Sequence, residues 1–174
     1  MKLVAKEMPT ALHSSALCAD LIKTMTAEHK NKPQAFKLRS QLLAQGRSNT
    51  PVAATDDLTV IVKVYASGGE NALHQHPNED HVFIILKGSA AFYDQDGETA
   101  TLGINEGYLV PKGALYRFHA VESEGPLVML RVGTPNYAVA MKPFRTDDGG
   151  KDFQGDTTKN KAVEVKVLED AYFG

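Results

Sequence analysis

Short runs of apolar and β-branched residues dominate the chain from Leu58 to Gly133, and this feature restricts the possible folds most. The runs recur at intervals of about eight to twelve residues, separated by turns rich in Gly, Pro, Asn and Asp. No helical pattern lies between them. This spacing predicts an antiparallel sandwich or barrel, in which each short strand buries one face and then reverses direction.

The flanking segments have a different texture. Residues 16–29 place apolar side chains at helical spacing and predict one amphipathic helix. Residues 36–46 fit either a short helix or a strand, and residues 47–57 predict a loop. Near the end of the chain, a polar stretch over residues 147–161 precedes an alternating pattern over 162–170 that predicts a strand.

Composition excludes several classes of protein. The chain has 174 residues, 43% of them apolar, which is enough for one domain with a hydrophobic core. Its net charge of -2 provides no basic surface for a nucleic acid, and its apolar runs are too short to cross a membrane. The N-terminus lacks the continuous apolar segment of a signal peptide. The single cysteine, Cys18, fits a reducing compartment, so we expect a cytoplasmic protein.

Half of the six histidines lie close together, at His74, His76 and His81. On a strand, His74 and His76 point to the same face, because side chains alternate. Pro77 and the following turn reverse the chain, and His81 opens the next strand. Three imidazoles placed in this way can converge on one ion at about two ångströms from each ring nitrogen. The cluster therefore predicts a metal site.

The spacing around these histidines resembles the first motif of the cupin superfamily. That motif is a Gly, five residues, His-x-His, three or four residues, a Glu, six residues and a Gly. Gly68, His74, His76 and Gly88 match it in register, and His81 occupies the position of the Glu. This position is a departure from the family pattern.

The second cupin motif is matched by Gly107, Pro111 and Gly113, with a shortened gap between the first two. Tyr116 occupies the position of the final His, which is a second departure. His119 lies three residues further along, and on a strand it would face away from Tyr116. The resemblance therefore favours Tyr116 at the site as a catalytic acid or base, and His119 is the alternative residue to complete it.

The resemblance implies an all-β fold, a double-stranded β-helix of the cupin or jelly-roll type, with a short N-terminal helical extension. We expect residues 1–57 to form that extension, 58–140 the barrel core, and 141–174 a polar loop and a C-terminal strand that packs on the barrel. The resemblance also implies a homodimer, because cupins commonly pair through sheet edges or by exchanging N-terminal strands, and the strand predicted over residues 163–168 offers a further exposed edge.

The predicted ligands His74, His76 and His81 favour a divalent transition metal, Fe, Ni, Zn or Cu, over the hard cations that prefer oxygen. Glu79 and Asp80 are alternatives to His81 at the third position. The positive charge of such a site favours a small anionic ligand. The first functional interpretation is a metal-dependent enzyme, an oxygenase or a non-redox lyase or isomerase. A non-catalytic metal-binding or sensing cupin and a metal-free cupin of the sugar-epimerase type are the alternatives.

Overall fold

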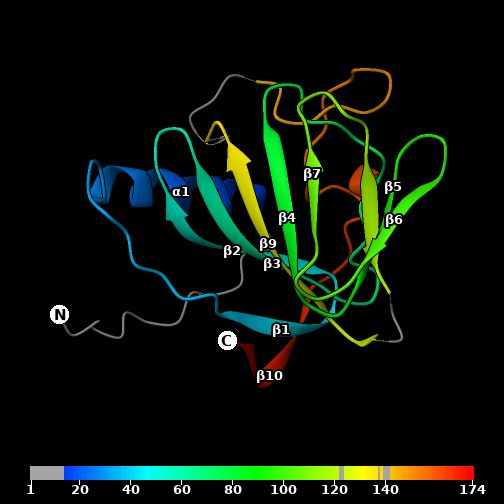
Figure 1. Ribbon diagram of the computed structural model, residues 1–174, viewed down its shortest axis with the longest axis horizontal. Helices are drawn as coiled ribbons and strands as arrows, with labels where there is room; N and C mark the ends of the chain where they lie inside the picture. Colours follow the sequence, from blue (N-terminus) through cyan, green and yellow to red (C-terminus); the bar gives the residue numbers. More distant parts are fainter. Residues whose placement is uncertain (1–13, 122–123, 137, 139–141) are drawn as a thin grey trace.

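The computed structural model describes residues 14–121, 124–136, 138 and 142–174. The fold is all-β with one α-helix, and the predicted double-stranded β-helix of the jelly-roll type is confirmed (Figure 1). In chain order the elements are α1 (Ser15–Glu28), β1 (Ser40–Gln45), β2 (Arg47–Ala54), β3 (Thr59–Tyr65), β4 (Asp80–Lys87), β5 (Ala90–Tyr93), β6 (Glu98–Leu102), β7 (Gly107–Val110), β8 (Arg117–Ala120), β9 (Leu127–Thr134), a 3₁₀ turn η2 (Thr158–Asn160) and β10 (Lys166–Phe173). Within the described ranges, no helix is long and apolar enough to span a membrane.

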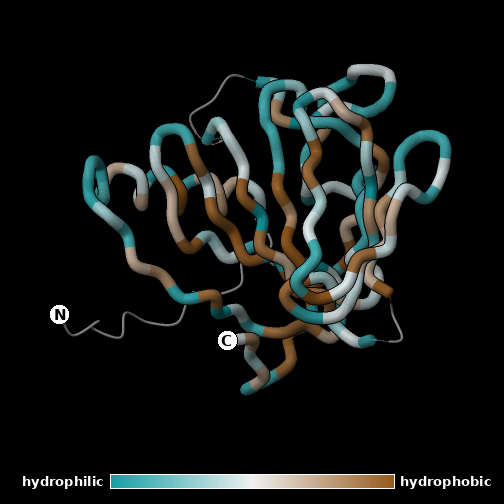
Figure 2. The backbone as a smooth tube through the Cα atoms, in the orientation of Figure 1, coloured by the Kyte–Doolittle hydropathy of each residue, from teal (hydrophilic) through white to brown (hydrophobic). Residues whose placement is uncertain are grey.

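Two sheets form the barrel. The larger has the strand order β2-β3-β9-β4-β7 and the smaller the order β6-β5-β8. All the pairs of strands in both sheets are antiparallel. Figure 2 shows apolar residues concentrated along the strands of the larger sheet and polar residues in many of the loops that join them. This distribution follows from burial of the inward-facing side chains between the sheets.

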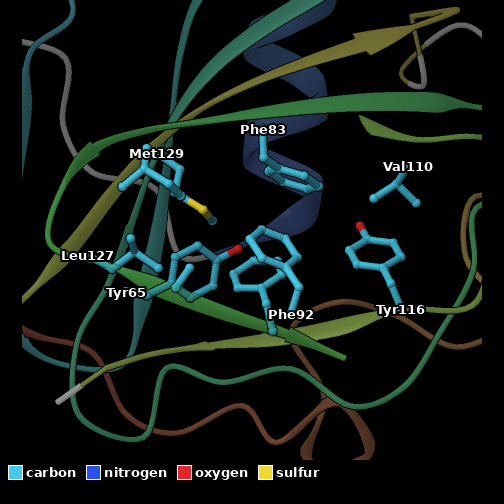
Figure 3. Close-up of a cluster of buried hydrophobic side chains, with 10 residues drawn as sticks. Tyr65, Phe83, Phe92, Val110, Tyr116, Leu127 and Met129 are labelled. Carbon is cyan, nitrogen blue, oxygen red and sulfur yellow. The ribbon is translucent and has the colours of Figure 1, made fainter. Parts of the chain in front are cut away.

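Alternation along the strands supplies the core. In β4, Phe83 and Ile85 are buried, whereas Val82 between the buried positions is exposed. Phe83 meets Phe92 of β5 and Phe118 of β8 at ring-centroid distances of 6.0 and 5.5 Å. Figure 3 shows Phe83 and Phe92 reaching from different strands into the same interior. The aromatic contacts thus join the two sheets at one end of the barrel.

The outer face of the larger sheet is covered in part by a third layer. Strands β1 and β10 pair with each other, and Leu43 of β1 is buried against Val62, Val64 and Val128. Residues 36–46, which the sequence left open between helix and strand, therefore contain a strand. The predicted C-terminal strand is present as β10.

The predicted helix over residues 16–29 is confirmed as α1. Ser14 caps its N-terminus by accepting a hydrogen bond from the backbone amide of Leu17. Cys18 and Ile22 are buried against Ala54 of β2 and Ile61 of β3. The helix therefore packs on the β2 and β3 side of the larger sheet, where the smaller sheet does not extend (Figure 1).

The predicted loop over residues 47–57 is wrong, because residues 47–54 form strand β2. Pro51 cannot donate to a strand neighbour, which argues against a strand in the interior of a sheet. Strand β2 is however at the edge and pairs only with β3, with an irregularity between Pro51 and Ala53. Residues 1–13 and 139–141 lie outside the described residues, so the predicted domain boundaries stay a prediction.

We expect the change Phe83→Ala to lower the free energy of unfolding by about 3–5 kcal/mol, because it removes a buried ring and leaves a cavity. Val82→Ala, one position along the same strand but 36% exposed, is the matched control and should cost less than about 1 kcal/mol. Urea denaturation followed by circular dichroism measures both. Equal losses for the two variants would contradict the assignment of the inner face.

Candidate functional site

The barrel contains a cavity of about 220 Å³ between the larger sheet, α1 and the segment from residue 144 to 155. Its wall differs from the aromatic end of the core because it carries many polar and charged side chains. These are Asn49, Lys63, Asn71, His74, His76, Glu79, His81, Tyr116, Arg131 and Arg145. In the described part of the chain, polar and charged side chains are therefore set among apolar ones around a partly open cavity, which is the usual character of a ligand site.

Backbone pairing holds the first two histidines in place. His74 exchanges two hydrogen bonds with Tyr116, at N···O distances of 3.0 and 2.8 Å. Gln75 pairs with Thr146 in the same way, and the amide of Gly113 donates to the carbonyl of His76 at 2.9 Å. The segment is thus extended, as predicted, and is fixed from both sides.

The hydrogen bonds of His74 and His76 leave ring nitrogens unused. His74 Nδ1 lies 2.7 Å from the carbonyl oxygen of Ala72, so Nδ1 carries the proton and Nε2 is an acceptor. His74 Nε2 and His76 Nδ1 are both buried and have no hydrogen-bond partner within the described residues. Burial lowers the pKa of both rings well below the ordinary value, so both are neutral and able to bind a cation.

His81 lies at the centre of a buried polar network. Its Nε2 is 3.0 Å from Glu79 Oε2 and 2.5 Å from Arg131 Nη2, and its Nδ1 is 3.2 Å from the Tyr116 hydroxyl. Burial, with a contribution from Arg131, lowers the pKa of His81 to about 4, although Glu79 opposes the shift. His81 is therefore neutral near pH 7.

The Glu79 carboxylate is 5% exposed and points into this network. Arg131 Nη2 donates to Glu79 Oε1 at 2.5 Å. Burial alone would raise the pKa of the Glu79 carboxyl, but Arg131 and His81 lower it below the ordinary value. Gly133 provides the space, because a Cβ atom there would collide with Glu79 Oε1. Glu79 is thus a charged carboxylate at the site.

Of the predicted ligands, His76 and His81 come together with Glu79. One ligand atom from each lies within 4.8 Å of the others. His74 stands beside this group, with its ring centroid 5.1 Å from that of His76. Asp80, the other alternative at the third position, accepts a hydrogen bond from the Lys112 amide and is not in the group. The ligand assignment itself stays a prediction.

Tyr116 and His119, the two candidates near the second motif, face opposite sides of the chain. Tyr116 is 4% exposed and faces the histidines, with its ring centroid 4.5 Å from that of His74. Burial raises the pKa of the Tyr116 phenol, so the hydroxyl stays protonated. His119 lies away from the cavity, beside Tyr93 at a centroid distance of 5.0 Å. The catalytic role of Tyr116 is not tested by these positions.

The donor set fits a transition metal with one constraint. Two neutral imidazoles and a carboxylate suit Zn, Fe, Ni or Cu, and the unpartnered His76 Nδ1 is a buried acceptor that such an ion would satisfy. Arg131, however, contacts both Glu79 and His81. A bound cation would therefore share the Glu79 carboxylate with this guanidinium.

Sequence reasoning missed the cations of the cavity. Lys63 and Arg131 lie in apolar strands at positions of the same parity as the inward-facing Tyr65 and Met129. Their parity is a signal that could have placed them inside. Arg145 lies in a predicted polar loop and reaches the cavity because Thr146 pairs with Gln75. Nothing in the sequence indicates that pairing.

Comparison with known proteins gives one family match. Residues 61–133 match the family described as Cupin domain. "Uncharacterized protein YdbB" of Bacillus subtilis (strain 168) is 36% identical over 70 residues, which are 40% of this chain and 60% of that protein. The matched segment is therefore less than two thirds of the relative's length.

Solved structures give weaker likenesses. KdgF from Halomonas sp. superposes with a TM-score of 0.48 at 19% identity, over 52% of this chain and 79% of that one. A cupin-2 domain protein from Shewanella frigidimarina has a TM-score of 0.44 at 26% identity, over 52% and 82% of the two chains. With TM-scores this low, neither protein carries an argument about function.

We expect Arg131→Met to lower the free energy of unfolding by about 3–5 kcal/mol, because it leaves the Glu79 carboxylate buried without its cation. The double variant Glu79→Gln/Arg131→Met removes both charges and should be more stable than Arg131→Met alone. Urea denaturation of wild type, both single variants and the double variant gives the coupling energy. Strictly additive losses would show that the two groups do not interact.

Proposed function

From the match of residues 61–133 to the family described as Cupin domain, we propose that the protein is a metal-dependent enzyme acting on a small anionic molecule inside the barrel. One observation carries the proposal. His76, Glu79 and His81 present their ligand atoms within 4.8 Å of one another, inside a cavity whose other charged groups are mainly cations. A metal and an anion would each satisfy part of this wall.

The metal-binding residues in this proposal are His76, Glu79 and His81, with His74 Nε2 as a further donor on the same wall. When bound, an ion of this kind supplies Lewis-acid or redox chemistry to the substrate. Arg131, on β9, contacts both Glu79 and His81 and so restrains their side chains. The proposed reaction is either that of an oxygenase or that of a non-redox lyase or isomerase.

Tyr116 is proposed to act as the acid that transfers a proton to the substrate. Its hydroxyl lies 3.2 Å from His81 Nδ1, and its raised pKa keeps it protonated. Tyr116 can therefore donate its proton to a substrate oxygen on which negative charge develops next to the histidines, and the phenolate regains a proton from water when the product leaves. The buried rings of Phe83, Phe118 and Tyr65 line the same cavity and give this side of it an apolar wall.

A second candidate function is supported by Arg131. Its guanidinium already supplies a positive charge against Glu79 and His81, which is the role a metal would otherwise take. A metal-free enzyme of the sugar-epimerase type would then use His81 and Tyr116 as base and acid. A non-catalytic metal-binding cupin would retain the metal without turnover.

We expect elemental analysis of the purified protein to find iron, nickel, zinc or copper near one equivalent. His76→Ala should lose most of this metal, because it removes a donor without altering the rest of the wall. His119→Ala, a histidine outside the cavity, is the matched control and should retain it.

The third ligand is distinguished by comparing His81→Ala with Glu79→Gln in the same assay. Metal that stays after His81→Ala but leaves after Glu79→Gln assigns Glu79 as the essential donor. No metal in wild type, even after dialysis against each of the four ions, would overturn the metal proposal and favour the metal-free candidate.

We also propose the homodimer that the family resemblance implies, together with the cytoplasmic location. Strand β7 is a sheet edge, and its Leu109 is 65% exposed next to Val82 of β4. Ile104, in the loop that leads into β7, is 58% exposed. An exposed edge strand with apolar side chains is commonly covered by another chain.

Leu109→Lys should convert a dimer to a monomer, because it places a charge within the apolar contact. Multi-angle light scattering measures the mass, with Leu17→Lys as the control, since Leu17 is 58% exposed on α1. The Leu17→Lys variant should remain a dimer. If the wild type is a monomer, or if Leu109→Lys remains a dimer, this interface is ruled out.

A further inference from the structure

Arg145 differs from the other arginines that face the interior. Arg47 donates to the carbonyl oxygens of Glu70, Gly155 and Asn160, and Arg131 binds Glu79. The guanidinium of Arg145 makes no hydrogen bond and no ion pair with any described residue, and its Nε is buried without a partner. Arg145 is half-buried, so its outer donors can meet a ligand or water, but an Nε donor that is buried without a partner is unfavourable.

Lys63 lies on the same part of the wall. Its ammonium donates to Asn49 Oδ1 at 2.6 Å, and it has no ion pair within the part of the chain that the structure describes. Burial, followed by the charges of Arg131 and Arg145, lowers the pKa of Lys63 well below its ordinary value. Burial and the neighbouring cations thus disfavour the charged form of Lys63, and an anion bound beside Lys63 and Arg145 would stabilise it, since no nearby carboxylate of the described residues does so.

The carboxylates in the neighbourhood are already in use or face solvent. Glu79 binds Arg131, and Asp156 accepts a hydrogen bond from the backbone amide of Ser15. Asp152 is exposed. Lys63 and Arg145 also line a second chamber of about 120 Å³, whose wall includes Arg47, Asn71 and Asn160 but none of the histidines.

The position of Arg145 is fixed by its surroundings. Gly155 lies against its Nη1, and a Cβ atom at that position would collide with the guanidinium. The ring of Phe153 is 5.9 Å from the guanidinium carbon. Arg145 is therefore held at the junction of the two chambers, since it lines both.

We propose that Arg145 and Lys63 form a second anion-binding subsite, so that the ligand of this protein is a small molecule with two anionic groups. One group binds at the histidine and Glu79 centre, and the other binds the Arg145 fork and the Lys63 ammonium. The planar guanidinium matches a carboxylate or a phosphate bidentately, and Lys63 adds a point charge. The first half of this arrangement rests on the proposed function, whereas the second half does not.

The test compares two probes of equal chain length, succinate with two carboxylates and butyrate with one. Isothermal titration calorimetry of the wild-type protein should give a dissociation constant for succinate at least about tenfold lower. Arg145→Met should remove this preference without weakening butyrate. Arg117→Met is the matched control, because Arg117 stacks on Tyr93 outside the cavity, and should behave as wild type.

Two further variants separate a failure of the second subsite from a failure of the proposed metal centre. Lys63→Met should reduce the preference as well, and it replaces Arg145→Met if that variant fails to give a normal thermal melt. His76→Ala disrupts the proposed metal centre and should weaken both probes by a similar factor, which leaves their ratio unchanged. The affinity for both probes thus reports on the histidine centre, and the ratio of the succinate and butyrate dissociation constants reports on Arg145.

A third probe, 3-phosphonopropionate, identifies the outer group. Binding tighter than that of succinate assigns a phosphate-like group to Arg145, and weaker binding assigns a carboxylate. Equal dissociation constants of wild type for all three probes would overturn the second subsite, as would a preference for the dianions that survives in both Arg145→Met and Lys63→Met.

Discussion

The buried contact between Arg131 and Glu79 is the interaction on which the interior of the barrel depends. Each group alone would be a charge removed from water, and together they compensate for much of that cost. The surrounding sequence accommodates the pair. Gly133, two residues after Arg131 on β9, leaves the space that the Glu79 carboxylate fills, and His81 of β4 contacts both partners.

The same strands carry the fold and the site, and they change character within two residues. On β4 the inward-facing residues run from Ile85 and Phe83, which are apolar, to His81. On β9 they run from Met129 to Arg131. The apolar end joins the two sheets through aromatic contacts, as Figure 3 shows for Phe83 and Phe92. The packed apolar end of each strand therefore positions the polar residues that follow it on the same strand. In this way a small domain can hold several buried polar groups in one arrangement.

The local spacing of residues made it possible to predict the fold and part of the site. Alternation placed His74, His76 and Tyr116 on the inner side, because a strand repeats every two residues wherever it begins. It could not place Glu79, which precedes β4 by one residue, since the shape of the turn determines where that side chain points. The loop predicted over residues 47–57 contains β2, whose Pro51 fits a strand only at the edge of a sheet, and sequence alone does not reveal which strand lies there. Arg145 reaches the cavity through a long-range pairing that no local pattern encodes.

The charges of the interior connect these features to ligand binding. Lys63, Arg131 and Arg145 face a cavity in which Glu79 is the buried carboxylate among the described residues. Burial lowers the pKa of Lys63 most, and the neighbouring cations Arg131 and Arg145 lower it further. A metal ion at His76, Glu79 and His81 would increase the positive charge, and an anion beside Arg145 would offset it. Since both ligands act on the same field, each must strengthen the binding of the other by the same factor.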